Sequence, residues 1–149
     1  MFAGKYCNRD VIICGPDDSL RTAIQLMRTH HVGDVLVVQQ LAGNTTPVGI
    51  LTDRDIVLEV LAQDVDIDSV SVGDVMSDQI VTVQEDTYLS ETVDIMRTNG
   101  IRRLPVVNRA GALQGIISID DCLEFLGEQI QKLAMLVKTE QRHERQSRS

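Results

Sequence analysis

Aromatic residues are scarce in this chain of 149 residues, which has two Phe, two Tyr and no Trp. Few rings are therefore available as stacking platforms for single-stranded nucleic acid. Basic residues are also in the minority: 14 Lys and Arg stand against 22 Asp and Glu, and the formal net charge is −8. Because binding along a phosphate backbone needs a basic face, we expect no nucleic acid partner.

Long apolar runs are missing as well. No stretch approaches the roughly 20 residues needed to cross a bilayer, so we expect neither a membrane partner nor a signal peptide. The three cysteines, Cys7, Cys14 and Cys122, are widely spaced and form no C-x-x-C pair. This usage predicts reduced, packed thiols and a cytoplasmic protein. The remaining composition, 43% hydrophobic and 24% charged, is typical of a globular chain.

Motifs of the common enzyme and metal classes are also lacking. The chain has no G-x-S-x-G, no Walker glycine loop and no G-x-G-x-x-G. Asp64, Asp66 and Asp68 imitate the start of a calcium loop, but Ser69 stands where that loop needs glycine. We therefore expect no catalytic residue, no metal site and no enzymatic activity.

What the chain does contain is an internal repeat. Leu20 aligns with Leu89, and Met27-Arg28-Thr29 aligns with Met96-Arg97-Thr98, at an offset of 69 residues. Further on, Gly49-Ile50 aligns with Gly115-Ile116 at an offset of 66. The slippage falls in residues 43–47, whose Gly, Asn and Pro are typical of a loop. Matching segments on both sides of a variable loop indicate a duplicated fold.

Each copy shows the same order of local patterns, which predicts a β-α-β-β-α unit. Apolar runs predict strands at residues 11–13, 35–38 and 48–51 of the first copy and 80–83, 104–107 and 113–117 of the second. Helical spacing begins at Leu20 and Leu89, after the N-cap candidates Asp18-Ser19 and Asp86-Thr87. Leu20, Ala23, Ile24 and Met27 follow that spacing in the first copy, and Leu89, Val93 and Met96 in the second. A second helix is expected at 53–62 and from 120 onward.

A unit of about 60 residues is marginal alone, so we expect the two copies to pack about a pseudo-twofold axis. The predicted class is α+β, with α/β-like units. The predicted organisation is repeat 1 at residues 8–63, an acidic linker at 64–75, repeat 2 at 76–127, and a C-terminal helix extension with a basic tail at 128–149.

One motif recurs where the last strand of each copy meets its second helix. It is Gly49-Ile50-Leu51-Thr52-Asp53-Arg54-Asp55 in the first copy and Gly115-Ile116-Ile117-Ser118-Ile119-Asp120-Asp121 in the second. The glycine allows a close approach to the strand. The hydroxyl and the Asp three residues later form a capping-box pattern, with Asp in place of the usual Glu. They also suit a ligand, because a helix N-terminus binds anions and a carboxylate accepts from ribose hydroxyls. The two interpretations are compatible.

The repeats resemble a tandem pair of cystathionine-β-synthase (CBS) domains, the Bateman module, as found in small stand-alone bacterial-type proteins. The resemblance covers roughly residues 8 to 127 and rests on the doubled motif, on Gly100 to Val107 and on Asp74 to Ser77. It implies clefts between the repeats that bind an adenosine nucleotide such as AMP, ADP or ATP, ahead of NAD or S-adenosylmethionine. No other cofactor is implied.

By matching position, the resemblance assigns Thr52, Asp55, Ser118 and Asp121 to phosphate and ribose, and Ile101 to Pro105 and Thr82 to the adenine pocket. Arg54 is a further phosphate candidate, with a solvated surface arginine as the alternative. The full set of predicted binding residues is Thr52, Arg54, Asp55, Thr82, Ile101, Arg102, Arg103, Leu104, Pro105, Ser118 and Asp121.

The copies differ in charge at one place. Gly33 and Asp34 occupy the positions of Arg102 and Arg103. An arginine attracts a phosphate and an aspartate repels it, so we expect unequal sites, with the tighter cleft next to the arginines. Sequence alone leaves open whether the arginines serve their own repeat or reach across the axis.

The end of the chain has an apolar seam. Leu123, Leu126, Ile130, Leu133 and Val137 are spaced 3, 4, 3 and 4 residues apart. The seam fits either an amphipathic helix on its own body or a contact with a second subunit, and the resemblance favours a homodimer. Residues 138–149 have no apolar pattern, and we expect them to fray.

The expected function is a regulatory sensor of adenine nucleotides. Ligand would change the packing of a homodimer, and an unidentified effector protein would respond, because the chain has no room for an output domain. The alternative is a structural or adaptor dimer with non-functional nucleotide clefts.

Overall fold

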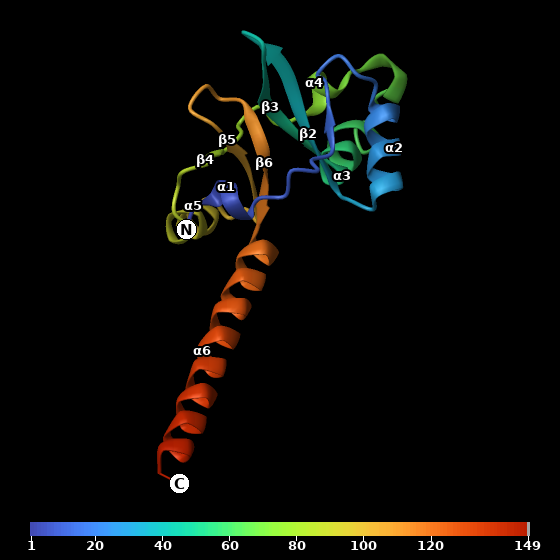
Figure 1. The fold of residues 1–149 in the computed structure, drawn as a ribbon. Helices are drawn as coiled ribbons and strands as arrows, with labels where there is room; N and C mark the ends of the chain where they lie inside the picture. Colours follow the sequence, from blue (N-terminus) through green and yellow to red (C-terminus); the bar gives the residue numbers. More distant parts are fainter. Residues whose placement is uncertain (149) are drawn as a thin grey trace.

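The computed structural model describes residues 1–148 and contains two three-stranded sheets, from which a long C-terminal helix projects (Figure 1). The elements up to residue 75 are α1 (Ala3–Tyr6), β1 (Ile13–Cys14), α2 (Leu20–His30), β2 (Asp34–Leu41), β3 (Asn44–Thr52), α3 (Asp53–Asp55), the π-helix η1 (Ile56–Leu61), the 3-10 helix η2 (Ile67–Ser69) and α4 (Val72–Val75). They are followed by β4 (Val83–Gln84), α5 (Leu89–Asn99), β5 (Arg103–Val107), β6 (Leu113–Ser118) and α6 (Ile119–Ser147). The predicted α+β class is confirmed.

The two sheets have the same topology. In the first, β2 lies between a parallel β1 and an antiparallel β3; in the second, β5 lies between a parallel β4 and an antiparallel β6. The β2–β3 register shifts between Val37 and Val38, and the β5–β6 register shifts between Val106 and Val107. The duplication therefore extends to the irregularities of the backbone.

Each repeat has its own core, built on the apolar face that the helical spacing predicted. Leu20, Ala23 and Met27 of α2 are buried against their sheet, as are Leu89 and Met96 of α5. The prediction for Val93 is wrong, because its side chain is 38% exposed. Thr92 is buried in its place, and its hydroxyl donates to the Tyr88 carbonyl at 3.0 Å, so the buried polar group is paired.

The short helices that precede each sheet are exchanged between the cores. Ala3 of α1 is fully buried in the second core, and the Ala3 N–H donates to the Thr87 carbonyl at 2.8 Å. Val72 of α4 is fully buried in the first core, and its N–H donates to the Asp18 carbonyl at 2.9 Å. Part of the segment predicted as a linker thus contributes to the first core, and the exchange ties the two repeats together.

The glycines of the doubled motif allow this exchange. A Cβ on Gly115 would lie 2.6 Å from the Asn8 carbonyl oxygen and from the Cys7 sulfur, just after α1. A Cβ on Gly49 would lie 2.8 Å from the Ser77 carbonyl oxygen, just after α4. The predicted close approach to each strand is confirmed, and in each case the approaching chain comes from the other side of the duplication.

Two local predictions need correction. β1 and β4 are shorter than predicted and begin at Ile13 and Val83, and the residues before β1 lie in a cleft between the sheets. Ser19 caps α2 as predicted, accepting from the Thr22 N–H, but neither Asp86 nor Thr87 is the N-cap residue of α5. Tyr88 stands there without a side-chain bond, because the Leu89 N–H donates to the Met1 carbonyl of the docked N-terminus.

The prediction that residues from 138 onward fray is wrong for the described part, since α6 continues without a break to Ser147. The helix leaves the body at an end of β6 and extends away from both sheets (Figure 1). Packing of its apolar seam on the chain's own body is therefore also excluded, because the five seam residues are 52% to 68% exposed. Within residues 1–148, no helix combines the length and the apolar character that crossing a membrane requires.

Candidate functional site

The doubled motif forms two complete capping boxes. The Thr52 hydroxyl accepts from the Asp55 N–H at 3.0 Å, and the Asp55 carboxylate accepts from the Thr52 N–H at 3.0 Å. Ser118 and Asp121 make the same pair of bonds at 3.1 and 2.8 Å. The capping interpretation is confirmed at both positions. Each cap holds the turn between the last strand and its helix in one conformation.

In the second cap, the hydroxyl also acts as a hydrogen-bond donor. Ser118 also donates to Oδ2 of Asp121 at 2.9 Å, so its proton is used inside the cap. To donate to a phosphate, the Ser118 hydroxyl would first have to break this hydrogen bond with Asp121. Asp121 accepts both bonds at Oδ2, which leaves its second oxygen outside the hydrogen bonds of the cap.

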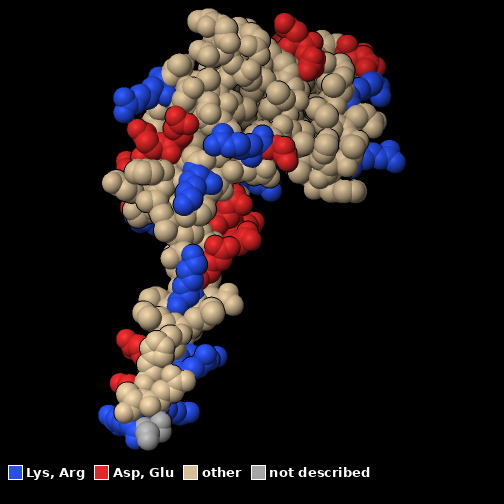
Figure 2. Space-filling model, in the orientation of Figure 1, with Lys and Arg blue, Asp and Glu red and all other residues tan. Residues whose placement is uncertain are grey.

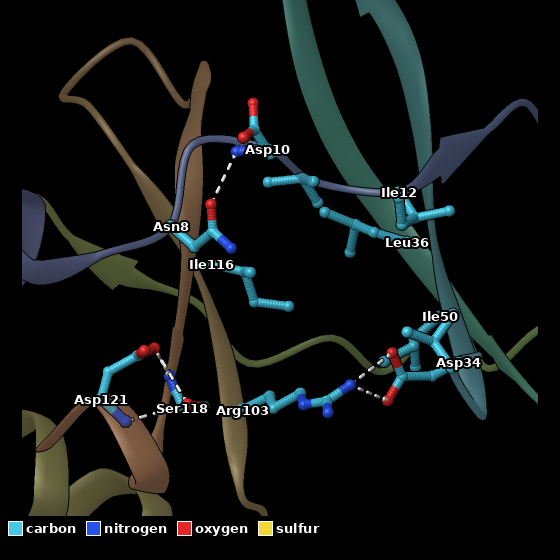
Figure 3. A pocket seen from close by; sticks show the side chains of 12 residues that line it. Asn8, Asp10, Ile12, Asp34, Leu36, Ile50, Arg103, Ile116, Ser118 and Asp121 are labelled. Carbon is cyan, nitrogen blue, oxygen red and sulfur yellow. Dashed lines mark hydrogen bonds and ion pairs between the residues drawn. The ribbon is translucent and has the colours of Figure 1, made fainter. Parts of the chain in front are cut away.

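A cleft lies between the two repeats and includes the second cap. Its volume is about 210 Å³, and an adjoining hollow of about 440 Å³ shares four of its residues, Asp34, Ile50, Arg103 and Ser118. Figure 3 shows how the walls are divided: Asn8, Ile116, Ser118 and Asp121 lie on the side of the second sheet, and Ile12, Leu36, Ile50 and Asp34 lie opposite. The cleft thus combines apolar walls with a charged floor.

An ion pair crosses this floor. Arg103 Nη1 donates to both carboxylate oxygens of Asp34 at 3.2 Å (Figure 3). The two side chains are 44% and 28% exposed, so water reaches the pair. Arg103 therefore reaches across from its own repeat to the other one. This answers the question that the sequence left open. Arg103 and Asp34 line the same cleft, where their charges are paired.

The predicted binding residues divide into two groups. Arg103, Ser118 and Asp121 line the cleft, and Ile101 and Arg102 line the adjoining hollow. The structure does not bring Thr52, Arg54, Asp55, Thr82, Leu104 and Pro105 into either lining. Leu104 is fully buried in the second core, Arg54 is exposed, and Asp55 faces a separate hollow of about 340 Å³ with Glu59 and Asp74. Among the described residues, the second cap thus lines the cleft, whereas the first motif contributes only Ile50 to it.

Several lining residues escaped the sequence analysis. Asn8, Asp10, Val11 and Ile12 belong to the segment that connects α1 to β1, and the exchange of α1 carries this segment past the cleft. The Asn8 side chain accepts from the Asp10 N–H at 2.9 Å, which fixes the turn there. The available signal was the alignment of Asn8 with Ser77, but it becomes informative only once the exchange is known.

The fold and the site define a pair of duplicated β-α-β-β-α domains with a polar cleft between them, and comparison with known proteins gives this class its name. The CBS domain model matches residues 3–62 and 72–128, which is most of the chain. The chain therefore belongs to the CBS domain family.

Individual proteins agree with this assignment. The chain is 38% identical over 121 residues to the protein MK0525 of Methanopyrus kandleri, a match that covers 81% of this chain and 60% of that relative's length. A crystal structure of hypoxic response protein I with two coordinated zinc ions is 28% identical, has a TM-score of 0.71, and is matched over 83% of this chain and 98% of that one. In residues 1–148 of the present chain, no cluster of three or more His, Cys, Asp or Glu side chains is arranged to hold a metal ion.

A third protein shares the fold at lower identity. The CBS domain pair of protein MJ0100, in complex with 5′-methylthioadenosine and S-adenosyl-L-methionine, is 21% identical, has a TM-score of 0.70, and is matched over 87% of this chain and 98% of that one.

Proposed function

We propose that this chain is a regulatory module that binds an adenosine ligand of the AMP, ADP or ATP class in the cleft between its repeats. The observation that carries the proposal is the cleft itself, where isoleucines from both repeats stand beside the start of α6 and the arginine pair. Apolar walls suit an adenine ring, and the guanidinium groups of Arg102 and Arg103 suit an anion. The MJ0100 complex supports this choice, since a domain pair of the same fold binds two adenosyl compounds.

The charged side chains favour binding of the ribose and of the phosphate at different parts of the cleft. The second oxygen of Asp121, with Asp10 on the opposite segment, suits donors such as the ribose hydroxyls. Arg102, which is exposed at the mouth of the adjoining hollow, and Arg103 suit the phosphate. A phosphate bound to Arg103 would compete with Asp34, which accepts from Nη1 of that side chain. Because this pair joins the two repeats, binding would change how they pack, which is the coupling that a regulatory module needs.

In this proposal the module acts as a cytoplasmic homodimer, has no catalytic activity of its own, and passes the change in packing to an effector protein. A ligand can shift that packing only by the difference between its affinities for the two arrangements. A ligand that competes for the ion pair between Arg103 and Asp34 would have different affinities for the two arrangements.

The test is a thermal-shift panel with AMP, ADP, ATP, NAD and S-adenosylmethionine. A ligand at 100 times its Kd adds about 2.7 kcal/mol to the free energy of unfolding, which raises the melting temperature by several degrees. We expect at least one adenosine nucleotide to do this, and inorganic phosphate at the same ionic strength to have no such effect. If every compound in the panel leaves the melting temperature unchanged, the proposal is wrong.

One observation favours the second candidate, a structural or adaptor dimer. The ion pair of Arg103 with Asp34 already satisfies the arginine that a phosphate would need. In that case the ion pair only stabilises the contact between the two repeats, and no compound in the panel binds.

A further inference from the structure

We propose that α6 forms an antiparallel pair with α6 of a second copy of this chain, and that this pair is the dimer interface. The inference gives the homodimer of the proposed function a specific contact, but it does not depend on nucleotide binding. It rests on two independent features of α6, an exposed apolar seam and an uneven distribution of charge, and on the register that both imply.

The seam is the first feature. Leu123, Leu126, Ile130, Leu133 and Val137 are 52% to 68% exposed, and they repeat every three to four residues along a helix of 29 residues. Single exposed apolar residues are ordinary, whereas a continuous stripe on a helix that leaves the body marks an interface. A heptad seam of this kind is covered most simply by another helix with the same seam.

The charged residues of α6 favour an antiparallel over a parallel arrangement of the two helices. Residues 119–130 of α6 contain four acidic and no basic residues, and residues 131–147 contain four basic and two acidic ones. The helix therefore carries a net charge of −4 near the body and +2 toward its free end, and Figure 2 shows acidic side chains where the helix leaves the body and basic ones at its tip. A parallel pair would place like charges side by side, whereas an antiparallel pair places each acidic half against a basic half.

One register pairs four of the five seam residues with each other and sets the acidic half of each helix against the basic half of the other. When Ile130 packs against Leu133 of the second copy, Leu126 falls against Val137 of that copy, as in the layers of an antiparallel coiled coil. Glu124 and Lys138 of the other chain both lie at b positions, on the outer surface of this pair, so the charges act through the two halves of the helix as a whole. The same register places Gly127 opposite Ala134, and a Cβ on Gly127 would have nothing within 4 Å in the single chain, so the two backbones have room to approach there.

The length of the helix is sufficient for this contact. The seam spans about 21 Å, which is marginal for a coiled coil on its own. In the antiparallel register, however, the two helices overlap along nearly their whole length, about 40 Å, and the end of each reaches the body of the other. The interface therefore extends beyond the seam.

Disulfide cross-linking tests whether the two copies of α6 run antiparallel. The double variant Leu126→Cys/Val137→Cys should form a covalent dimer under mild oxidation, whereas neither single variant should, because in this register residue 126 meets residue 137 of the other copy and not itself. A bond within one helix is excluded, since 11 residues rise about 16 Å and a disulfide joins Cα atoms no more than about 7 Å apart. The wild-type chain is the control for the native thiols, of which Cys14 and Cys122 are buried and Cys7 is half-buried.

Sedimentation analysis tests which face of α6 forms the dimer interface. Ile130→Lys should weaken dimerisation on the order of 100-fold, because it places two charges in the apolar seam. Met135→Lys is the matched control: Met135 is 61% exposed on the same helix but lies outside the seam, and this variant should remain dimeric.

Three results would overturn the inference. The wild-type chain could be monomeric at tens of micromolar; the single cysteine variants could cross-link with themselves, as in a parallel pair; or the dimer could survive Ile130→Lys without cross-linking, as expected if it used the exposed Val57, Leu58 and Leu61 of η1. Each is measured without nucleotide, so it is separate from a failure of the proposed function.

Discussion

Asp34 and Arg103 occupy equivalent positions in the two repeats, 69 residues apart, and they form an ion pair with each other. Each begins the middle strand of its sheet, β2 or β5, and each is paired in the antiparallel ladder with the cap residue of its own repeat, Thr52 or Ser118. The duplication thus brings two related positions face to face, and divergence has given them opposite charges. A phosphate ligand would compete for this contact.

The first prediction concerns the contribution of that pair to stability. Because both side chains are partly exposed, water screens the attraction, and the coupling energy should be at most about 1 kcal/mol. Urea unfolding of Arg103→Ala, Asp34→Ala and the double variant gives this energy as a double-mutant cycle. A coupling of several kcal/mol would show that the pair holds the repeats together, as a strut does.

The second prediction concerns the approach of the N-terminal segment to β6. Gly115→Ala places a Cβ 2.6 Å from the Asn8 carbonyl oxygen, so it should lower the free energy of unfolding by about 1 to 3 kcal/mol and loosen α1. Gly15→Ala is the control, because its Cβ would meet only Asp18 atoms, at 3.7 Å or more. Equal stability of the two variants in urea unfolding would contradict the observed exchange of α1.

The third prediction concerns the cap of α6. Ser118→Ala removes the acceptor of the Asp121 N–H and should cost about 1 kcal/mol. Ser118→Thr should retain most of this energy, because Thr52 makes the same cap in the first repeat. Chemical denaturation of the two variants checks the difference. A Ser118→Ala variant as stable as Ser118→Thr would mean that the capping box contributes nothing.

The fourth prediction concerns pH. Burial, and to a lesser degree the charge of Asp18, raise the pKa of the Cys14 thiol from 9.0 to about 11. The folded chain thus holds this proton more tightly than the unfolded chain. The resulting stabilisation is complete below pH 9 and is lost as the pH rises through 11. Cys14→Ala should therefore lose less stability between these values than the wild type does. Parallel curves for the two proteins would contradict the assignment.

The sequence was sufficient to predict features that depend on local pattern. The helical spacing from Leu20 and Leu89 and the two capping boxes are encoded by residues close together in the chain, and the structure contains them. The strand runs are also present, except that the first of each repeat begins only at Ile13 or Val83. The exposed seam of α6 was equally visible as a heptad, although sequence alone could not tell whether the body covers it.

Features that depend on long-range packing could not be predicted in this way. The exchange of α1 involves a helix of four residues with one buried side chain, Ala3, which is too short to show periodicity. The cleft is built around the segment that this exchange carries past β6, so Asn8 and Asp10 gave no local sign of their place. The opposite charges of Asp34 and Arg103 were evident, but their contact follows only from how the two sheets face each other.

The most direct test of the account is a calorimetric titration of AMP and of adenosine into the wild type, Arg103→Ala and Asp34→Asn. If the cleft binds the nucleotide and Asp34 competes for Arg103, Arg103→Ala should weaken AMP about tenfold or more, Asp34→Asn should strengthen it, and adenosine should be affected far less by either change. An AMP affinity that neither substitution alters, or no binding at all, would contradict the account.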